Sequence, residues 1–386
     1  MPAPDNVTRR LRALRLAPAP APAATSAATP PPAHGPAAGS LIIVGGAMSP
    51  DSGIVSKFVE LGGGSGVARV VVIPTAGLPT DGTGDVAAAA EKMVRMFEGE
   101  GVASVDVLHT LDRAVADSDE FCAPIREATV LFFGGGRQWK LYDAYFGTQV
   151  QAEVERLLER GGVVGGSSAG ASILGEHMAR GDTATNFTML GDHQVGLGLL
   201  ANASIDQHFL ARNRQFDMLQ ILEARPELLG VAVDEDTALV VTGTESQVIG
   251  THYVAFYVSE EWKAARGATP WSGRDFILLK AGDTFSLSER QPGQWDSGGL
   301  SAERWDTVLA DGEMVALLGE GEHMRQIAAA FRNNPSAAVR ESQKAEGAGD
   351  TGRFLEALAA AQARLEFDEE CAVLAALEGA AAERRR

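Results

Sequence analysis

The chain has 386 residues, 45% of them hydrophobic, and a formal net charge of −18 at pH 7. This length is sufficient for one sizeable α/β domain with appendages, and no apolar run approaches the roughly 18 residues that a membrane span requires. Because residues 1–40 hold four arginines against one aspartate, the rest of the chain bears −21. Such an acidic body argues against nucleic acid as a partner. It would attract a cationic substrate such as an arginine-bearing polypeptide, although an acidic surface more commonly serves solubility alone.

Residues 1–40 are rich in alanine and proline and have no hydrophobic period, which predicts a disordered arm. The pair Arg9-Arg10 suggests a twin-arginine export signal, and an excess of arginine is also typical of transit peptides. Prolines interrupt the segment where the apolar part of an export signal should follow. We therefore expect a cytoplasmic protein, with export or organelle targeting by the arm left open.

From Leu41 onward, apolar segments typical of buried strands alternate with helical segments, separated by glycine and proline. Strands are expected at about 41–45, 69–74, 104–108, 129–133 and 162–165, with helices at about 84–99 and 149–160. This alternation predicts a doubly wound, mostly parallel α/β sheet, in which functional groups gather at the carboxyl ends of the strands. Later strands, which should extend the same sheet in an antiparallel or mixed manner, are expected at about 203–206, 229–233, 238–242, 247–249 and 276–280.

A Gly-x-Ser-x-Gly sequence follows the fifth expected strand and precedes a helix-compatible run, Ile173–Met178. This is the context of a nucleophile elbow, in which a serine at a sharp strand-to-helix turn projects its hydroxyl above the sheet. Ser168 has Gly166 and Gly170 two residues to either side and is the candidate nucleophile, whereas Ser167 is a small neighbour in the turn. In a chain with 44 glycines, the motif alone also fits an ordinary tight turn.

A serine hydroxyl needs a base to remove its proton and a group to orient that base. His208 follows a strand-like segment, and three acids, Asp234-Glu235-Asp236, lie between two later apolar runs. Carboxylates beside buried strands destabilise the fold unless they meet partners, so His208 with Glu235 or Asp234 would complete the set. The order Ser…His…acid differs from the Ser…acid…His order of α/β-hydrolase esterases and argues against a lipase.

Taken in register, these motifs resemble those of cyanophycinases and their relatives in peptidase family S51, a group that also contains aspartyl dipeptidases. The resemblance extends from about Leu41 to Pro292 and rests on the segments Leu41–Gly46, Val70–Ala76, Phe132–Gln138, Gly166–Met178, Asp206–Phe209 and Asp234–Ala238. It implies a flavodoxin-like or class I glutamine amidotransferase-like fold. It also implies that Ser168 is the nucleophile, His208 the base and Glu235 the acid that orients the base. The backbone N–H groups of Gly135 and Ala169 would form the oxyanion hole.

The resemblance further implies substrate-binding positions, which are Arg137, Gln138, Gln207, Arg212, Arg214 and Asp217. Two of them depart from the family's pattern: Arg137 stands where an aspartate is usual, and Asp217 stands where a third spaced arginine is usual. If the two loops face each other, Arg137 and Asp217 are expected to form an ion pair that restores the charge pattern of the pocket. Otherwise they change that pattern and the substrate, or lie on the rim with little consequence.

The expected organisation is a disordered arm at 1–40, a catalytic α/β domain at 41–292 and a mainly helical extension at 293–386. The extension could pack on the domain, form a lid or mediate self-association, so a homodimer is left open. No histidine pair has the spacing of a zinc-binding helix, and Cys122 and Cys371 lie far apart, so neither a metal nor a cofactor is expected. His177 is expected on the helix after the elbow, in a packing role.

Three functions are compatible with these features. The first is a serine exopeptidase that releases β-Asp-Arg dipeptides from cyanophycin, a polymer with an aspartate backbone and arginine attached through β-linked amides. The second is a dipeptidase or isopeptidase for other Asp-containing peptides, which the departures at Arg137 and Asp217 favour. The third is a non-catalytic scaffold that binds a ligand, against which the retained Ser–His–Glu set and its strained turn argue. The first two act on a peptide or polypeptide and require neither nucleic acid nor a membrane.

Overall fold

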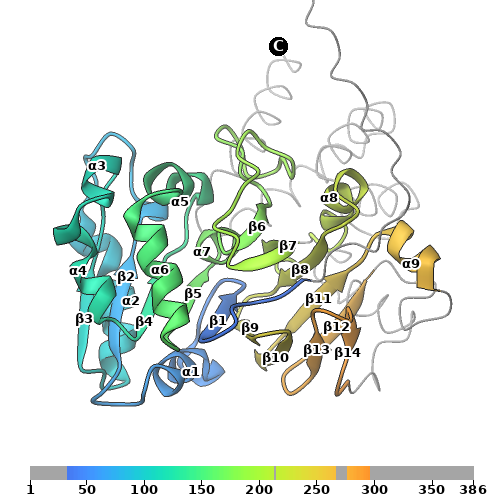
Figure 1. Ribbon diagram of the computed structural model, residues 1–386, viewed down its shortest axis with the longest axis horizontal. Helices are drawn as coiled ribbons and strands as arrows, with labels where there is room; N and C mark the ends of the chain where they lie inside the picture. The colour runs from blue at the N-terminus through green and yellow to red at the C-terminus, as the bar shows by residue number, and fades with distance from the viewer. Residues whose placement is uncertain (1–32, 213, 267–275, 296–386) are drawn as a thin grey trace, which may run out of the picture. The chain divides into compact units, whose positions relative to one another are not determined.

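The computed structural model describes residues 33–212, 214–266 and 276–295 (Figure 1). Most of the arm expected at 1–40 and nearly all of the extension expected at 293–386 lie outside these described residues. The disorder of the arm, the helices of the extension and the bounds of the three regions therefore remain predictions.

A nine-stranded sheet forms the larger framework of the fold. Its parallel half holds β1 (Ser40–Val44), β5 (Val163–Ser167), β4 (Val130–Phe133), β2 (Arg69–Ile73) and β3 (Ser104–Val107), in this order across the sheet. On the other side of β1 the sheet continues in antiparallel fashion through β9 (Thr237–Thr242), β10 (Glu245–Gly250), β13 (Thr284–Ser286) and β14 (Gln291–Pro292). The predicted parallel α/β sheet is confirmed, and its five strands lie close to their expected positions.

Helices cover both faces of the parallel half, because successive side chains of a strand point to opposite faces. One core cluster combines Ile42 and Val44 of β1 with α1 (Ile54–Leu61) and α2 (Val86–Gly99). The other combines Leu41 and Ile43 with α4 (Asp119–Glu127), α5 (Gln138–Tyr145) and α6 (Gln149–Glu159). Three short helices lie in the connections: the 3₁₀ helices η1 (Pro50–Ser52) and η2 (Thr75–Gly77), and the α-helix α3 (Arg113–Ala116). The doubly wound architecture is thereby confirmed.

A second, five-stranded sheet contains strands that follow the elbow in the chain. Its order is β12 (Ile277–Lys280), β11 (Tyr253–Tyr257), β8 (Leu229–Val233), β7 (Leu200–Gln207) and β6 (Gly175–Met178). The prediction that segments 203–206, 229–233 and 276–280 extend the first sheet is therefore wrong. Because β9 already occupies the edge of β1, β7 and β8 pair with each other, and α8 (Met218–Ala224) packs on β8. The helix α9 (Glu260–Arg266) follows β11.

The chain crosses between the two sheets at two points that matter for the site. After β5 it passes through the short helix α7 (Ala169–Ser172) into β6, and after β8 it turns through residues 234–236 into β9. In the second crossing Asp236 has a φ of 48°, in the left-handed region that non-glycine residues rarely occupy. Ser168 lies at the first crossing and Glu235 at the second.

The helix after the elbow is shorter than predicted. It ends at Ser172, and the segment predicted as its continuation forms β6, where His177 pairs in register with Ser204 of β7. Pairing within the second sheet thus outweighs the helical pattern of this segment. His177 is buried on a strand, its Nδ1 lies 3.2 Å from the Ser204 hydroxyl, and burial lowers its pKa to about 4. It is therefore a neutral packing residue.

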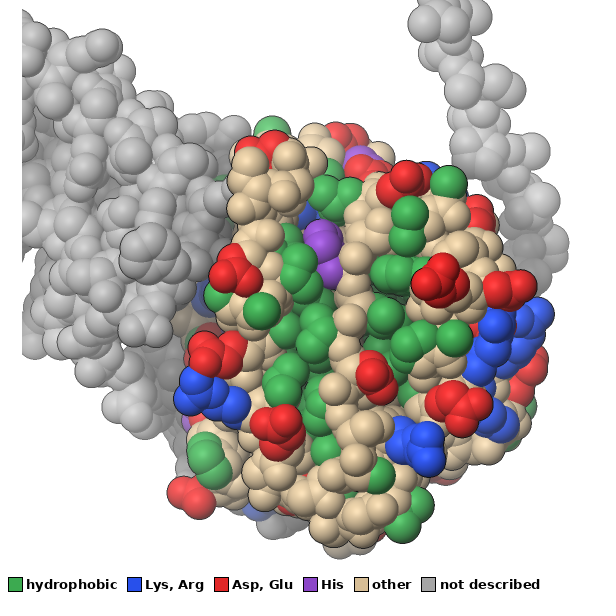
Figure 2. Space-filling model, turned by 90° about the vertical axis from the view of Figure 1, so that its left-hand side faces the viewer, with side chains coloured by type: hydrophobic (Ala, Val, Ile, Leu, Met, Phe, Trp, Pro, Cys, Tyr) green, Lys and Arg blue, Asp and Glu red, His purple; other side chains and the backbone are tan. Residues whose placement is uncertain are grey.

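β3 is the outer strand of the parallel half, at the opposite edge of the sheet from β14. Figure 2 faces this side of the molecule and shows apolar side chains gathered in a band between acidic and basic ones. On β3 itself, Asp106 and Val107 are exposed. A charged side chain on an edge strand disfavours pairing with the edge of another chain. A homodimer remains a prediction.

Candidate active site

Ser168 occupies a strained turn between β5 and α7. Its φ of 56° and ψ of −118° lie outside the regions that L-residues favour. Gly170 allows the turn to close, because a Cβ at this position would overlap the carbonyl oxygen of Phe133. The hydroxyl of the neighbouring Ser167 donates to the carbonyl oxygen of Gly46 at 2.6 Å. Of the two adjacent serines, only Ser168 presents its hydroxyl to a base.

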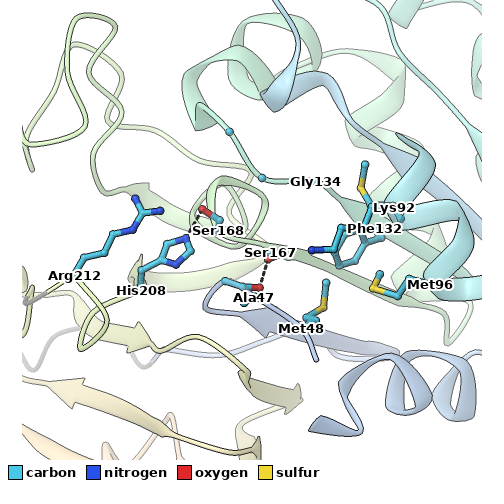
Figure 3. A pocket seen from close by; sticks show the side chains of 14 residues that line it. Ala47, Met48, Lys92, Met96, Phe132, Gly134, Ser167, Ser168, His208 and Arg212 are labelled. Atoms are coloured by element: carbon cyan, nitrogen blue, oxygen red, sulfur yellow. Dashed lines mark hydrogen bonds between the residues drawn. The ribbon is translucent and has the colours of Figure 1, made fainter. Parts of the chain in front are cut away.

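The candidate base is His208, whose Nε2 lies 2.8 Å from the Ser168 hydroxyl oxygen (Figure 3). Its Nδ1 lies 2.6 Å from Oε1 of Glu235. The imidazole is 8% exposed, so its orientation is set by packing as well as by these two contacts. Asp234, the other acid that the sequence leaves open, accepts hydrogen bonds from the backbone N–H groups of residues 210 and 211 instead. The structure thus brings Ser168, His208 and Glu235 into one hydrogen-bonded series.

The end of β1 positions all of these segments. The carbonyl oxygens of residues 44 and 45 accept hydrogen bonds from the backbone N–H groups of Ser168 and His208. The carbonyl oxygen of residue 46 accepts from the Ser167 hydroxyl, and that of residue 47 accepts from the backbone N–H of Asp236. A side chain at Gly46 would collide with the His208 ring, so glycine is required there. From the sequence alone, Leu41–Gly46 is interpreted only as the first strand. Its glycine pair directly after a buried strand is the signal of a close backbone approach.

Two backbone N–H groups lie beside Ser168. Ala169 is the first residue of α7, and Gly135 lies in the loop after β4, where a Cβ would come 3.3 Å from the Ser168 Cβ. Within the described part of the chain, neither N–H group donates a hydrogen bond. Their place next to the candidate nucleophile is what an oxyanion hole requires.

A pocket of about 290 Å³ opens at Ser168 (Figure 3). Its described lining comes from the end of β1, from α2, from β4 with its following loop, and from the elbow, together with His208 and Arg212. The contribution of α2 and of Met48 could not be read from any motif, because an amphipathic helix face looks the same whether it packs in a core or lines a cavity. Arg212 is the one residue of the expected substrate-binding set that this described lining includes.

Four of the other five expected substrate-binding residues hold the loops around the pocket. The side chain of Gln138 donates to the carbonyl oxygens of residues 179 and 180 at 2.8 and 2.9 Å. The guanidinium of Arg137 donates to the carbonyl oxygens of residues 182 and 185 at 2.5 and 3.0 Å. The side-chain oxygen of Gln207 accepts from Arg214 at 3.1 Å. All four side chains are buried, so they act on the pocket by positioning the segment after β6 and the end of β7.

The predicted ion pair between Arg137 and Asp217 is wrong. Asp217 accepts from Arg180 at 2.5 Å, and Arg180 also reaches both oxygens of Asp206 at 2.9 and 3.1 Å. Arg180 lies in the segment after β6 and is buried beside Asp217, whereas the described hydrogen bonds of the Arg137 guanidinium go to the carbonyl oxygens of residues 182 and 185. Burial opposes the charge of Arg180, but the two carboxylates outweigh it and raise its pKa above the ordinary value. The carboxylate that Asp217 introduces in place of the family's usual arginine is thus balanced by the buried cation Arg180 inside the protein.

Removing the Asp217 carboxylate should destabilise the fold strongly. In Asp217→Ala, the free energy of unfolding is expected to fall by about 3–5 kcal/mol, because a buried cation loses a partner. The matched control is Glu60→Ala, which removes the exposed partner of Lys57 and should change the free energy of unfolding by less than about 1 kcal/mol. Urea denaturation followed by circular dichroism measures both. Equal losses for the two variants would contradict the buried network.

The pH dependence of hydrolysis should report His208. Burial lowers the pKa of His208 and nearby Arg212 and Arg214 lower it further, while Glu235 opposes them. Because the base acts in its neutral form, kcat/KM should rise through an apparent pKa below the ordinary value of a histidine and then level off. Arg212→Gln removes a cation and should move this acid limb to higher pH, whereas Arg212→Lys should leave it in place. A profile of kcat/KM from about pH 4 to 9 tests this, and an unshifted limb in Arg212→Gln would contradict it.

The described residues contain no group of three or more histidine, cysteine, aspartate or glutamate side chains that could hold a metal ion. Among the described helices, none has the length and apolar character needed to cross a membrane.

Residues 41–249, more than half of the chain, match the model of peptidase family S51. The chain belongs to peptidase family S51. It is therefore a serine-type peptidase, a hydrolase that acts on a peptide or polymer, and not a non-catalytic scaffold.

Two cyanophycinases are among the relatives of this S51 peptidase. That of Geminocystis herdmanii (strain PCC 6308) is 29% identical over 266 residues, which cover 66% of this chain and 95% of the relative. That of Trichormus variabilis is 32% identical over 265 residues, which cover 65% and 86%. Among solved structures, a peptidase from an acI-B1 actinobacterium is 23% identical with a TM-score of 0.48, covering 64% of this chain and 97% of that one.

Proposed function

We propose that this S51 peptidase is an exopeptidase that hydrolyses cyanophycin and releases β-Asp-Arg dipeptides. The observation that carries the chemistry is the hydrogen-bonded series of Ser168, His208 and Glu235, with contacts of 2.8 and 2.6 Å. The choice of substrate is supported by the two cyanophycinases, which match over about two thirds of this chain.

In the proposed reaction, Nε2 of His208 takes the proton of the Ser168 hydroxyl as Oγ attacks the carbonyl carbon. The N–H groups of Gly135 and Ala169 stabilise the oxyanion of the tetrahedral intermediate. His208 then gives its proton to the leaving nitrogen as the C–N bond breaks, which leaves an acyl group on Ser168. A water molecule, deprotonated by His208, hydrolyses this ester. Glu235 holds the imidazole in the required tautomer through Nδ1.

A second candidate is a dipeptidase or isopeptidase that acts on other Asp-containing peptides. The charge of the pocket favours it, because the described lining holds the cations Lys92 and Arg212 but no aspartate or glutamate. Asp217, which could have received an arginine side chain of the substrate, is buried against Arg180. A guanidinium would therefore meet no described carboxylate in this pocket, whereas the carboxylates of an aspartyl peptide would meet two cations.

Incubation of the full chain with cyanophycin and with a panel of β-Asp-X dipeptides, followed by mass spectrometry, separates the two candidates. Release of β-Asp-Arg from the polymer supports the first. Cleavage of dipeptides without release from the polymer supports the second. The Ser168→Ala variant is the control for contaminating peptidases, and turnover of neither substrate class by the unaltered chain would contradict both.

A further inference from the structure

Lys92 is a cation of the pocket that the proposed reaction does not use. It belongs to α2, and together with Met93 and Met96 of the same helix it lines the pocket at Ser168. Figure 3 shows it on the opposite side of Ser168 from His208. Lys92 is therefore placed to contact a substrate held at Ser168, although it lies in none of the motifs recognised in the sequence.

The ammonium group of Lys92 has no described counter-charge. Among the residues that the structure describes, none forms an ion pair or a hydrogen bond with it. Its neighbour Glu91 pairs with Arg95 on α2, and both lie outside the described lining of the pocket. That lining contains no aspartate or glutamate. An anion that enters the pocket would therefore meet Lys92 without competition from a described carboxylate.

The apolar wall beside Lys92 favours such an ion pair. Met93 and Met96 are partly buried against a core cluster that contains Phe132, which is 1% exposed and also lines the pocket. Apolar groups next to a cation displace water, and the attraction between opposite charges rises as their surroundings become less polar. Because Lys92 itself is exposed, solvent still screens its charge, so the expected gain in rate is about tenfold and not several orders of magnitude.

The proposed reaction decides which part of the substrate meets Lys92. Because His208 gives its proton to the leaving nitrogen, the leaving group lies on the His208 side of Ser168. The acyl residue, whose carbonyl carbon is attacked, then extends toward the side of Lys92. We infer that Lys92 is a specificity-determining residue that binds a carboxylate carried by the acyl residue. This inference rests on the Ser168 chemistry proposed above.

Both proposed classes of substrate carry such a carboxylate. In cyanophycin, the acyl aspartate is joined through its side chain to an arginine, and the carboxylate of this arginine is free. In the other Asp-containing peptides, the acyl aspartate has a free carboxylate of its own. The shared chemistry is a carboxylate on the acyl side of the scissile bond, and the contact with Lys92 places no restriction on the guanidinium of the first substrate.

The test uses two pairs of covalent probes, all of them diphenyl esters of α-aminoalkylphosphonic acids. In the first pair, the side chain is that of aspartate or of asparagine. In the second pair, it is that of aspartate joined through its carboxyl group to arginine or to argininamide. The members of each pair thus differ only in a carboxylate that is replaced by a carboxamide.

In the labelling reaction, Ser168 forms an Oγ–P bond and phenoxide leaves with the proton that His208 has taken from Ser168. Intact-mass spectrometry measures the rate. In the unaltered chain, we expect the carboxylate member of at least one pair to label about tenfold faster than its carboxamide. The pair that shows this preference identifies the source of the carboxylate, which is either the aspartate itself or the arginine attached to it.

Variants of two cations on α2 test the role of Lys92 directly. Lys92→Gln should remove the preference for the carboxylate, whereas Lys92→Arg, which keeps the charge, should retain most of it. The matched control is Arg95→Gln, which removes an exposed cation of the same helix outside the described lining and should leave the preference unchanged. Absence of a preference in both pairs would overturn the inference, as would a preference that survives in Lys92→Gln. Equal losses in Lys92→Gln and Arg95→Gln would also overturn it, because they would reflect the net charge of the chain and not a contact.

A small uncharged fluorophosphonate separates failure of this inference from failure of the proposed nucleophile. It has no carboxylate, so it should label the unaltered chain and Lys92→Gln at the same rate, and a slower reaction of Lys92→Gln would show a structural role instead. If it labels Ser168 while neither probe pair shows a preference, only the assignment of Lys92 is wrong. If it labels the unaltered chain no more than Ser168→Ala, the proposed nucleophile is wrong and the assignment of Lys92 falls with it.

Discussion

Replacement of Ser168 by alanine should lower kcat/KM by about 10⁴-fold or more. The variant keeps the elbow and the His208–Glu235 contact but has no oxygen to form the acyl intermediate. Its fold should be unchanged, because the one side-chain hydrogen bond that the structure describes for Ser168 is the one to His208. Progress curves with a cleaved peptide, together with circular dichroism of the variant, measure both expectations.

The adjacent serine provides the matched control. Ser167→Ala removes the hydrogen bond to the Gly46 carbonyl, a contact that positions the end of β1 but does not reach His208. We expect a loss of about tenfold or less, since the hydrogen bond it removes is worth about 1 kcal/mol. If Ser167→Ala abolishes hydrolysis and Ser168→Ala retains it, the assignment of the nucleophile is wrong.

Replacement of Glu235 by glutamine should lower kcat by about 10³–10⁴-fold with little effect on folding. The carboxylate accepts from Nδ1 of His208 and so keeps Nε2 free to take the Ser168 proton. An amide nitrogen in that place can donate to Nδ1 and stabilise the wrong tautomer. Asp234→Asn is the control, because Asp234 accepts only from backbone N–H groups and His252 among its described contacts. A larger loss in Asp234→Asn than in Glu235→Gln would reverse the assignment of the acid.

The parallel half of the large sheet could be predicted because its signals are local. A strand buried on both faces is a short, nearly continuous apolar run, and β1, β2, β4 and β5 all have this form. The elbow is equally local, since the strained turn at Ser168 needs glycines two residues to either side. His208 and the acids at 234–236 carry a weaker signal, which is their place beside strand-like segments. The choice of Glu235 over Asp234 was indicated by the resemblance to the S51 family.

The pairing of the later strands could not be predicted, because strand pairing is decided by which edge is free. β9 covers the edge of β1, so β7 and β8 form a second sheet. The predicted Arg137–Asp217 pair failed for a similar reason. Opposite charges at two sequence positions do not show whether another charged residue will pair with one of them. Arg180, which pairs with Asp217, belongs to none of the motifs recognised in the sequence.

By itself, the sequence determined the parallel α/β framework, the position of the elbow and the set of side chains able to perform serine peptidase chemistry. These depend on the backbone preferences and hydrophobic period of short segments. Only the tertiary structure decided that the carbonyls of residues 44–47 hold the segments of Ser168, His208 and Glu235 together. It also decided that Asp217 is neutralised by Arg180 and that methionines of α2 reach the pocket. Each of these depends on contacts between segments far apart in the chain, whose distances follow from packing and not from composition or spacing.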